Sequence, residues 1–272
     1  VHFVKQRQAI LAGQAHIARK GKAAIEGISH YAVEAAILKV YGSEVLDYVI
    51  DEAVQIHGGM GYSAEMAVER GYRDSRINRI FEGTNEINRL LVVDTAMKRA
   101  MKGDFDLFGK AEALASNLEN IAEVGASGET YFEEKIRLIR NFKKLILLII
   151  HKASRHFDKK LIQEQEVLNN LADMIMEVYL AESMTLRIEK MESMPGQNGS
   201  GIYREMLDIF VYDAADKIRK PAADAIHSFV SGDESAVLMK VAESLTHVPG
   251  INIKEGRRKI ADKLIEENKY TF

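Results

Sequence analysis

The chain contains 272 residues, which is long enough for one or two domains with cores of their own. Its formal net charge of −3 and its pI of about 6.3 argue against nucleic acid as the main partner. The absence of cysteine excludes disulfides, thiolate catalysis and Cys-ligated metal, and the longest aliphatic run, residues 145–150, is far shorter than the ~20 residues that span a bilayer.

The first part of the chain is predicted to be helical. Only three prolines occur in the whole sequence, and Ala, Leu, Ile, Lys and Glu are abundant. Apolar spacing predicts helices over residues 1–20, 22–41, 43–57, 65–77 and 84–102. We expect Gly42 and Ser43 to end the second of these helices and to cap the third, and Gly58 and Gly59 to end the third.

The second part of the chain has the same character. Helices are predicted over residues 110–123, 130–156, 160–193, 202–229, 233–246 and 255–268, with a surface loop over residues 194–201. Pro221 is expected to kink or break the fourth of these helices. Glycines over residues 103–109 or 125–128 would serve as a linker. The predicted fold class is all-α, with one helical bundle over residues 1–104 and a second over residues 105–272.

A carboxylate on a turn before a helix is the candidate for chemistry. In the segment Y-R-D-S-R-I-N-R-I-F-E-G-T-N-E-I-N-R, residues 72–89, Glu82 directly precedes Gly83 and Thr84. Thr84 is a good N-cap for the helix that follows, and Gly83 allows a positive φ or the close approach of a ligand. From these residues alone, Glu82 is either a side chain that reaches into a cleft or a simple partner of the helix dipole.

Three blocks together resemble one family. Q-I-H-G-G-M-G-Y at residues 55–62, R-D-S-R-I at residues 73–77 and F-E-G-T-N-E-I-N-R at residues 81–89 are similar, in order and spacing, to the C-terminal helical domain of flavin-dependent acyl-CoA dehydrogenases. The resemblance covers about residues 34–101. It implies that Glu82 is the general base that removes the α-proton of an acyl thioester. It also implies that Phe81 and Gly83 lie against the substrate, and that the backbone amide of the base polarises the thioester carbonyl.

The resemblance also implies a set of cofactor-binding residues. The residues that match positions near FAD in the family are Gln55, Gly58, Gly59, Thr84 and Glu86. The first three would reach the FAD of a neighbouring subunit; the alternative is that they form a helix end followed by a turn. No metal-binding spacing accompanies His57, so we expect this side chain to be packed or hydrogen-bonded.

Two groups of charged residues have alternative interpretations. Arg73, Asp74 and Arg76 are expected to form ion pairs within the domain or at a subunit interface, and a ligand-binding role is the alternative. Residues 131–160 carry nine Lys or Arg against three Asp or Glu around a strongly aliphatic centre. This stretch is either a core helix, which we prefer, or a segment in peripheral contact with a membrane. Acyl-CoA dehydrogenases that act on very long chains have a C-terminal helical extension of this size.

The sequence is therefore identified as the C-terminal portion of an acyl-CoA dehydrogenase with such an extension. The parent enzyme would oxidise an acyl-CoA to the trans-2-enoyl-CoA in fatty-acid β-oxidation and pass electrons from FAD to an electron-transferring flavoprotein. We expect a homodimer or homotetramer, located in the cytoplasm of a bacterium or, in a eukaryote, in the mitochondrial matrix or at its inner membrane. Nothing in the chain is typical of the family's β-domain, so we expect the isolated chain to be inactive. The alternatives are a non-catalytic helical oligomerisation module and a family relative that acts on a non-fatty-acyl substrate.

Overall fold

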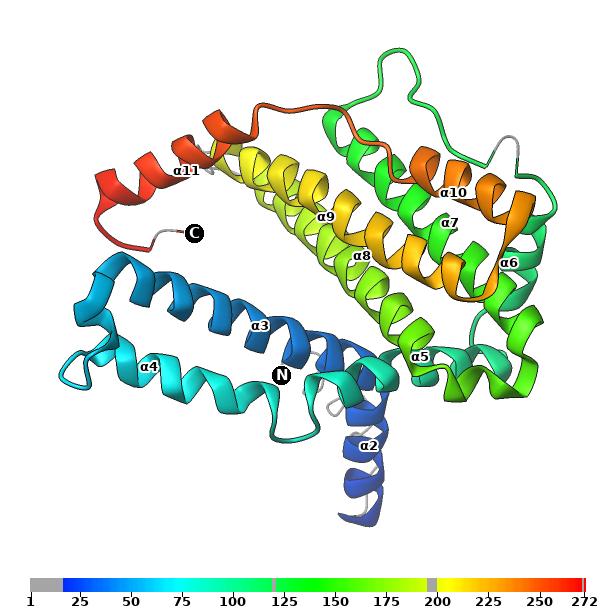
Figure 1. Ribbon diagram of the computed structural model, residues 1–272, viewed down its shortest axis with the longest axis horizontal. Coiled ribbons are helices and arrows are strands. Elements are labelled where there is room, and N and C mark those ends of the chain that lie inside the picture. The colour runs from blue at the N-terminus through cyan, green and yellow to red at the C-terminus, as the bar shows by residue number, and fades with distance from the viewer. Residues whose placement is uncertain (1–16, 119–120, 195–199, 271) are drawn as a thin grey trace. The chain divides into compact units, whose positions relative to one another are not determined.

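The computed structural model describes residues 17–118, 121–194, 200–270 and 272, and these are helical nearly throughout (Figure 1). No strand occurs in these ranges, as the all-α prediction requires. The chain divides into two compact units, Val1–Asp104 and Phe105–Phe272. Most of the expected helix over residues 1–20 and most of the expected loop over residues 194–201 lie outside the described residues.

The first unit is built around one long helix. Its elements are α2 (Ile17–His30), α3 (Ala32–His57), the 3₁₀ helix η1 (Gly58–Tyr62), α4 (Ala67–Arg76), the 3₁₀ helix η2 (Ile77–Arg79) and α5 (Asn85–Met101). Helix α3 packs against both α4 and α5, and its buried Ile37 and Val40 form a small core with Val92 and Val93 of α5. This packing places the connection from η2 to α5 beside α3.

The predicted helix break at Gly42 and Ser43 is wrong. Helix α3 continues through both residues, and the break lies earlier, at Tyr31. Ser43 remains helical because its hydroxyl donates a hydrogen bond to the carbonyl of Val40, 2.9 Å away, and its buried side chain meets Asn85 of α5. Tertiary contacts therefore override the weak local preference of a Gly-Ser pair for a helix end.

The second unit is a bundle of longer helices. Its elements are α6 (Leu107–Ala115), α7 (Tyr131–Phe157), the 3₁₀ helix η3 (Asp158–Gln163), α8 (Gln165–Glu192), α9 (Ser200–Phe229), α10 (Gly232–Leu245) and α11 (Ile253–Glu267). Helix α6 is shorter than the predicted 110–123. Helix α9 continues past Pro221, so the alternative of a break there is wrong, whereas the alternative of a kink stays a prediction. Ile218 and Ala222, on either side of the proline in the sequence, are both buried.

Helix α7 lies in the core of this unit. Its aliphatic centre is buried, including Leu145, Leu148 and Ile149, and its basic side chains pair with carboxylates of the same unit, as Lys144 does with Glu123 at 3.1 Å. The burial favours the core interpretation of residues 131–160 over a membrane-facing one. Within the described part of the chain, no helix is long and apolar enough to cross a membrane.

Candidate functional site

The turn of residues 80–84, here called the Glu82 turn, has an unusual backbone. Glu82 has a φ of +52° and Gly83 a φ of +81°, so two successive residues are left-handed. Glycine adopts this conformation freely, whereas a residue with a side chain loses roughly 1–2 kcal/mol in it. The Glu82 side chain is exposed. A strained residue of this kind persists only where its surroundings hold it, which makes the turn a candidate for function.

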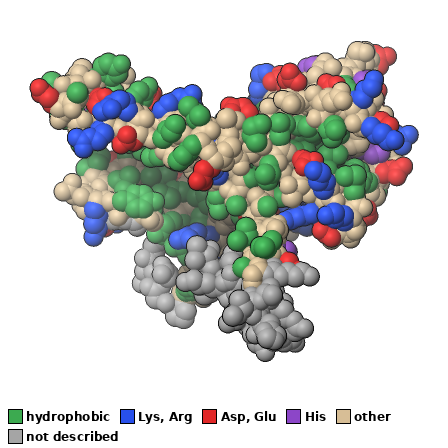
Figure 2. Space-filling view, turned by 90° about the horizontal axis from the view of Figure 1, so that it is seen from below, with side chains coloured by type: hydrophobic (Ala, Val, Ile, Leu, Met, Phe, Trp, Pro, Cys, Tyr) green, Lys and Arg blue, Asp and Glu red, His purple; other side chains and the backbone are tan. Residues whose placement is uncertain are grey.

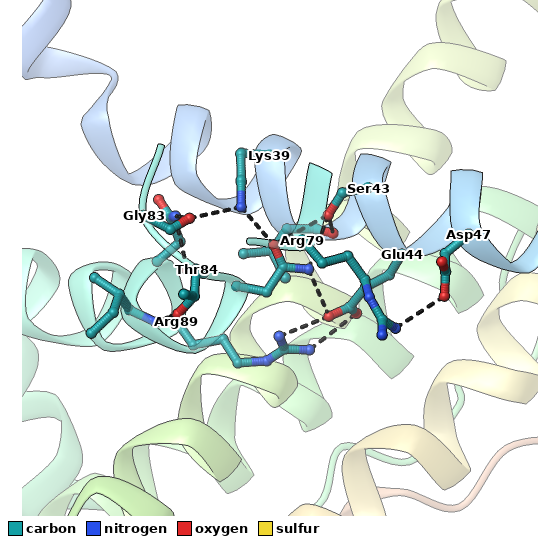
Figure 3. A network of polar contacts seen from close by, with 12 residues as sticks. Lys39, Ser43, Glu44, Asp47, Arg79, Gly83, Thr84 and Arg89 are labelled. Carbon is teal, nitrogen blue, oxygen red and sulfur yellow. Dashed lines mark hydrogen bonds and ion pairs between the residues drawn. The ribbon is translucent and has the colours of Figure 1, made fainter. Parts of the chain in front are cut away.

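Two side chains hold the turn at one carbonyl. Lys39 of α3 extends its Nζ to the carbonyl oxygen of Gly83 at 2.8 Å, and the Nδ2 of Asn88 on α5 donates to the same oxygen at 2.9 Å (Figure 3). Asn88 also donates to the carbonyl of Thr84 at 3.1 Å. The backbone that follows Glu82 is thus tied to two helices.

A buried polar network lies beneath the turn, between α3 and α5. Asn85 is only 2% exposed, and its Oδ1 accepts from Lys39 Nζ at 2.8 Å. Its Nδ2 donates to the Ser43 hydroxyl at 2.9 Å and to Glu44 at 3.1 Å. Glu44 in turn accepts two bonds from the Arg89 guanidinium, at 2.8 and 3.0 Å (Figure 3). Because charged groups take part and the amide is fully bonded, the network fixes the start of α5 against α3.

Thr84 and Glu86 have local roles at the start of α5. The Thr84 hydroxyl accepts from the backbone N–H of Ile87 at 3.3 Å, which confirms the predicted N-cap. Hydrogen bonds from its own backbone N–H and from the Thr84 hydroxyl lower the pKa of the Glu86 carboxyl. Both side chains therefore stabilise the start of α5, close to Glu82 in the sequence. This structural role accounts for both residues without a ligand.

The other predicted binding residues lie at the far end of α3. Residues 55–61, here called the glycine segment, include the exposed Gln55 and the left-handed Gly58, with a φ of +60°. A Cβ on Gly61 would stand 2.6 Å from the backbone oxygen of Val54, so this residue must be glycine for packing. Gly59 has neither constraint: its φ is ordinary, and nothing lies within 4 Å of where its Cβ would be. Its backbone is open to a close approach from outside the chain.

The structure does not bring the two groups of predicted residues together within one unit. Lys39, which contacts the Glu82 turn, and Gln55 are sixteen residues apart on the same helix. A rise of 1.5 Å per residue separates them by about 24 Å along its axis. A single small ligand therefore cannot contact both ends of α3.

Apolar residues flank the exposed carboxylate in the sequence, and their side chains reach the surface. Ile80, Phe81 and Ile87 are each about half exposed, at 48%, 47% and 57%. Hydrophobic side chains also reach the surface on the face drawn in Figure 2. A carboxylate among apolar groups becomes a more effective base once a ligand covers it and excludes water. The arrangement suits proton removal from a covered, mostly apolar substrate.

Two of the remaining candidates, Arg73 and His57, have structural contacts within their own helices. Arg73 pairs with Glu69 one turn earlier on α4 at 2.6 Å, so its ion pair is local to that helix. His57 lies 2.8 Å through its Nδ1 from the carbonyl of Ala53, which agrees with the expected hydrogen-bonded role. No group of His, Cys, Asp or Glu suited to a metal occurs among the described residues.

Sequence reasoning missed the residues that support the turn. Lys39, Ser43 and Glu44 lie on α3, whose prediction rests on its apolar residues. A spacing of four residues places Lys39 and Ser43 on one face of the helix, with Glu44 next to Ser43. Asn85 and Asn88 belong to the F-E-G-T-N-E-I-N-R block. Nothing in the neighbouring sequence indicates that Asn85 is buried or that the Asn88 side chain donates to the carbonyl of Gly83. The partners of Asn85 are more than 40 residues away in the sequence. The partner of Asn88 is a carbonyl that only the strained turn brings within reach.

Comparison with known proteins adds a family assignment. Residues 3–97 and residues 141–243 each match a family described as "Acyl-CoA dehydrogenase, C-terminal domain". A probable acyl-CoA dehydrogenase of Bacillus subtilis (strain 168) is 39% identical over 253 residues, covering 93% of this chain and 42% of the relative. The human very long-chain specific acyl-CoA dehydrogenase of mitochondria is 31% identical over 229 residues, covering 73% of this chain and 33% of the relative.

A solved structure is similar over the whole chain. The crystal structure of an acyl-CoA dehydrogenase from Bacillus anthracis, complexed with FAD, has a TM-score of 0.92 and 37% sequence identity. The structural match covers 100% of this chain and 46% of the chain in that crystal structure. The chain thus spans less than half the length of these relatives, and the similarity extends through the second unit as well as the first.

Proposed function

This chain belongs to the acyl-CoA dehydrogenase family, and on that premise we propose that it forms the C-terminal part of an FAD-dependent enzyme that oxidises an acyl-CoA to the trans-2-enoyl-CoA. The observation that carries the proposal is the Glu82 turn: an exposed carboxylate on strained backbone, which two helices hold through the Gly83 carbonyl, with exposed apolar residues next to it in the sequence. Similarity to a very long-chain enzyme of mitochondria supports a fatty acyl substrate.

In this proposal Glu82 is the general base. Its carboxylate takes the proton from the α-carbon of the acyl thioester as the Cα–H electron pair moves into the new double bond. The backbone N–H of Glu82 donates to the thioester carbonyl, which stabilises the negative charge that develops there. Phe81 and Gly83 line the substrate side of the turn. When bound, FAD supplies the acceptor for the hydride that leaves the β-carbon.

The glycine segment fits the approach of a dinucleotide. Gln55 offers an exposed amide, and the open surroundings of Gly59 allow phosphate or adenine atoms to come close to the backbone. Because this segment lies about 24 Å from Lys39 along α3, we assign it to a cofactor site shared with a neighbouring subunit rather than to the pocket of its own Glu82. The caps at Thr84 and Glu86 belong to the Glu82 end, where the reacting part of the cofactor would lie.

We further propose that the first unit is covered by other protein in the working enzyme. Large hydrophobic side chains more than half exposed on this unit include Ile25, Ile28, Leu38, Tyr48, Val49, Ile56, Met60 and Tyr62. A water-exposed surface of this kind is typical of an interface. It supports an assembly of subunits, for which we propose a homodimer or homotetramer. We propose an electron-transferring flavoprotein as the acceptor of the electrons on the basis of the family alone.

The test is Glu82→Gln in the full-length protein, with Asp94→Asn on α5 as the matched control. Gln is nearly isosteric, so acyl-CoA and FAD binding should stay close to normal. Enoyl-CoA formation should fall by about 10²–10⁴-fold, the usual effect of losing a required base. Asp94→Asn removes a carboxylate whose ion pair with Lys98, at 2.7 Å, lies within α5, and it should keep close to the wild-type rate. A Glu82→Gln enzyme that works at the wild-type rate would place the base elsewhere.

A further inference from the structure

One lysine connects the candidate base to the long helix. Lys39 lies in the first half of α3, and its Nζ donates to the Gly83 carbonyl and to Asn85 Oδ1, both at 2.8 Å. These partners are 44 and 46 residues further along the chain. The ammonium therefore bridges the residue after Glu82 and the first residue of α5 (Figure 3).

The bond to Gly83 acts on the strained part of the turn. Glu82 is left-handed, which is unfavourable for a residue with a side chain, so its conformation depends on the contacts around it. The direction of the Gly83 carbonyl sets the path by which the chain leaves Glu82. Lys39 and Asn88 both bond this oxygen, from α3 and α5. Without the ammonium, the Asn88 amide of α5 would be the one side-chain donor to this oxygen among the described residues.

Lys39 is itself held in a fixed place. Its second acceptor, Asn85, is buried and bonded to Ser43 and Glu44, and Glu44 is clamped by Arg89. Because every partner of the Asn85 amide is fixed, the position offered to the ammonium is fixed as well. Such support is how a protein holds a reacting group within a fraction of an ångström.

We propose that Lys39 is a positioning residue for Glu82: by holding the Gly83 carbonyl against α3 it keeps the Glu82 carboxylate and backbone N–H in the conformation that removes the α-proton. The inference rests on the proposed function of Glu82. Lys39 acts through the turn and touches no reacting atom, so its removal changes the rate of the chemical step more than substrate binding. A misplacement of about 1 Å in such a site costs about 10²-fold in rate.

The experiment uses the full-length enzyme with Lys39→Met and Lys39→Arg. The matched control is Lys98→Met, which removes a lysine from the same unit whose ion pair with Asp94, at 2.7 Å, lies within α5. We expect Lys39→Met to lower kcat by between about 10- and 100-fold with KM changed less than threefold or so. Arg can reach two acceptors, so Lys39→Arg should recover most of the loss. Lys98→Met should keep the wild-type kcat.

A double-mutant cycle separates positioning from a general structural effect. If Lys39 acts through Glu82, Lys39→Met lowers kcat in the wild-type background and has a much smaller effect in a Glu82→Gln background, where the carboxylate is gone and the backbone N–H alone still depends on Lys39. If Lys39→Met leaves kcat within about twofold of wild type, or lowers it equally in both backgrounds, the positioning role is overturned. In that case a slow Glu82→Gln enzyme still supports the proposed function. If Glu82→Gln itself works at the wild-type rate, both the proposed function and the positioning role fall.

Discussion

Three neighbouring glycines of the glycine segment should respond differently to the same change. Gly58, Gly59 and Gly61 occur within four residues, but each meets different surroundings. Gly58 is left-handed with free space around it, and Gly61 is buried against the backbone of Val54. Gly59 has an ordinary φ and free space. Each can be replaced by alanine, so the added methyl group is the same in all three variants.

The structure gives a magnitude for each variant. Gly58 has a φ of +60° and a ψ of −150°, a combination that glycine adopts far more readily than alanine, so Gly58→Ala should cost about 1–3 kcal/mol of unfolding free energy. Gly61→Ala forces a Cβ to 2.6 Å from a backbone oxygen and 2.8 Å from the Cβ of His57, so the end of α3 must shift. Overpacking of this kind costs typically about 1–3 kcal/mol. Gly59→Ala should change the free energy by about 0.5 kcal/mol or less, in either direction.

Cofactor retention should follow a different order from stability. If FAD approaches Gly59, the methyl of Gly59→Ala occupies the space that the cofactor needs, and the full-length variant should bind FAD at least about tenfold more weakly. Gly42→Ala is the control, since Gly42 also has free space and an ordinary φ but lies outside the segment. It should keep wild-type affinity.

Two measurements decide the outcome. Urea unfolding of the chain, followed by circular dichroism, gives the stability order, and titration of the full-length apoprotein with FAD, followed by visible absorbance, gives the affinity. A Gly61→Ala protein as stable as Gly59→Ala would refute the packing argument. A Gly59→Ala protein with normal stability and normal FAD affinity would show that no cofactor approaches this residue.

Two further predictions concern the second unit and the chain as a whole. Burial raises the pKa of the Glu177 carboxyl, whose Oε2 lacks a hydrogen-bond partner, so ionised Glu177 destabilises the fold above the ordinary pKa. Glu177→Gln should therefore raise the thermal midpoint at pH 7. This gain should shrink as the pH falls through the raised pKa toward the ordinary one. A lower midpoint at pH 7 would contradict the argument. The 272-residue chain alone, supplied with FAD and palmitoyl-CoA, should form no enoyl-CoA, and measurable turnover would show that it holds a complete site.

Capping residues and apolar spacing, which act over a few positions, are enough to predict helices such as α5 and α7. Thr84 was expected to cap α5, and its hydroxyl does accept from Ile87. The limits of α5 and α7 follow from apolar periodicity and capping residues, which act within a few positions. The family blocks pointed to Glu82 and the glycine segment. These features required no knowledge of distant contacts.

Features that depend on distant contacts were not predictable in this way. The sequence around Ser43 predicts a cap, because serine is common at helix ends. The contact that keeps Ser43 inside α3 involves Asn85, which is 42 residues away. The left-handed conformation of Glu82 could not be read from an E-G pair, since Gly83 alone would have satisfied the turn. It depends on Lys39 and Asn88, which converge on one carbonyl only in the folded unit. The same applies to Pro221, where buried neighbours outweigh a strong local signal.

The separation of the two candidate regions along α3 predicts that copies of the enzyme complement one another. If Glu82 of one subunit works with the glycine segment of its neighbour, a mixed dimer of Glu82→Gln and Gly59→Ala subunits contains one doubly altered site and one unaltered site. Differently tagged copies, purified in tandem, should then recover about half the wild-type turnover per mixed dimer, although each variant alone is impaired. If both regions served one site within a subunit, every site in the mixed dimer would carry one change and no recovery would occur. The distance of about 24 Å between Lys39 and Gln55 favours recovery.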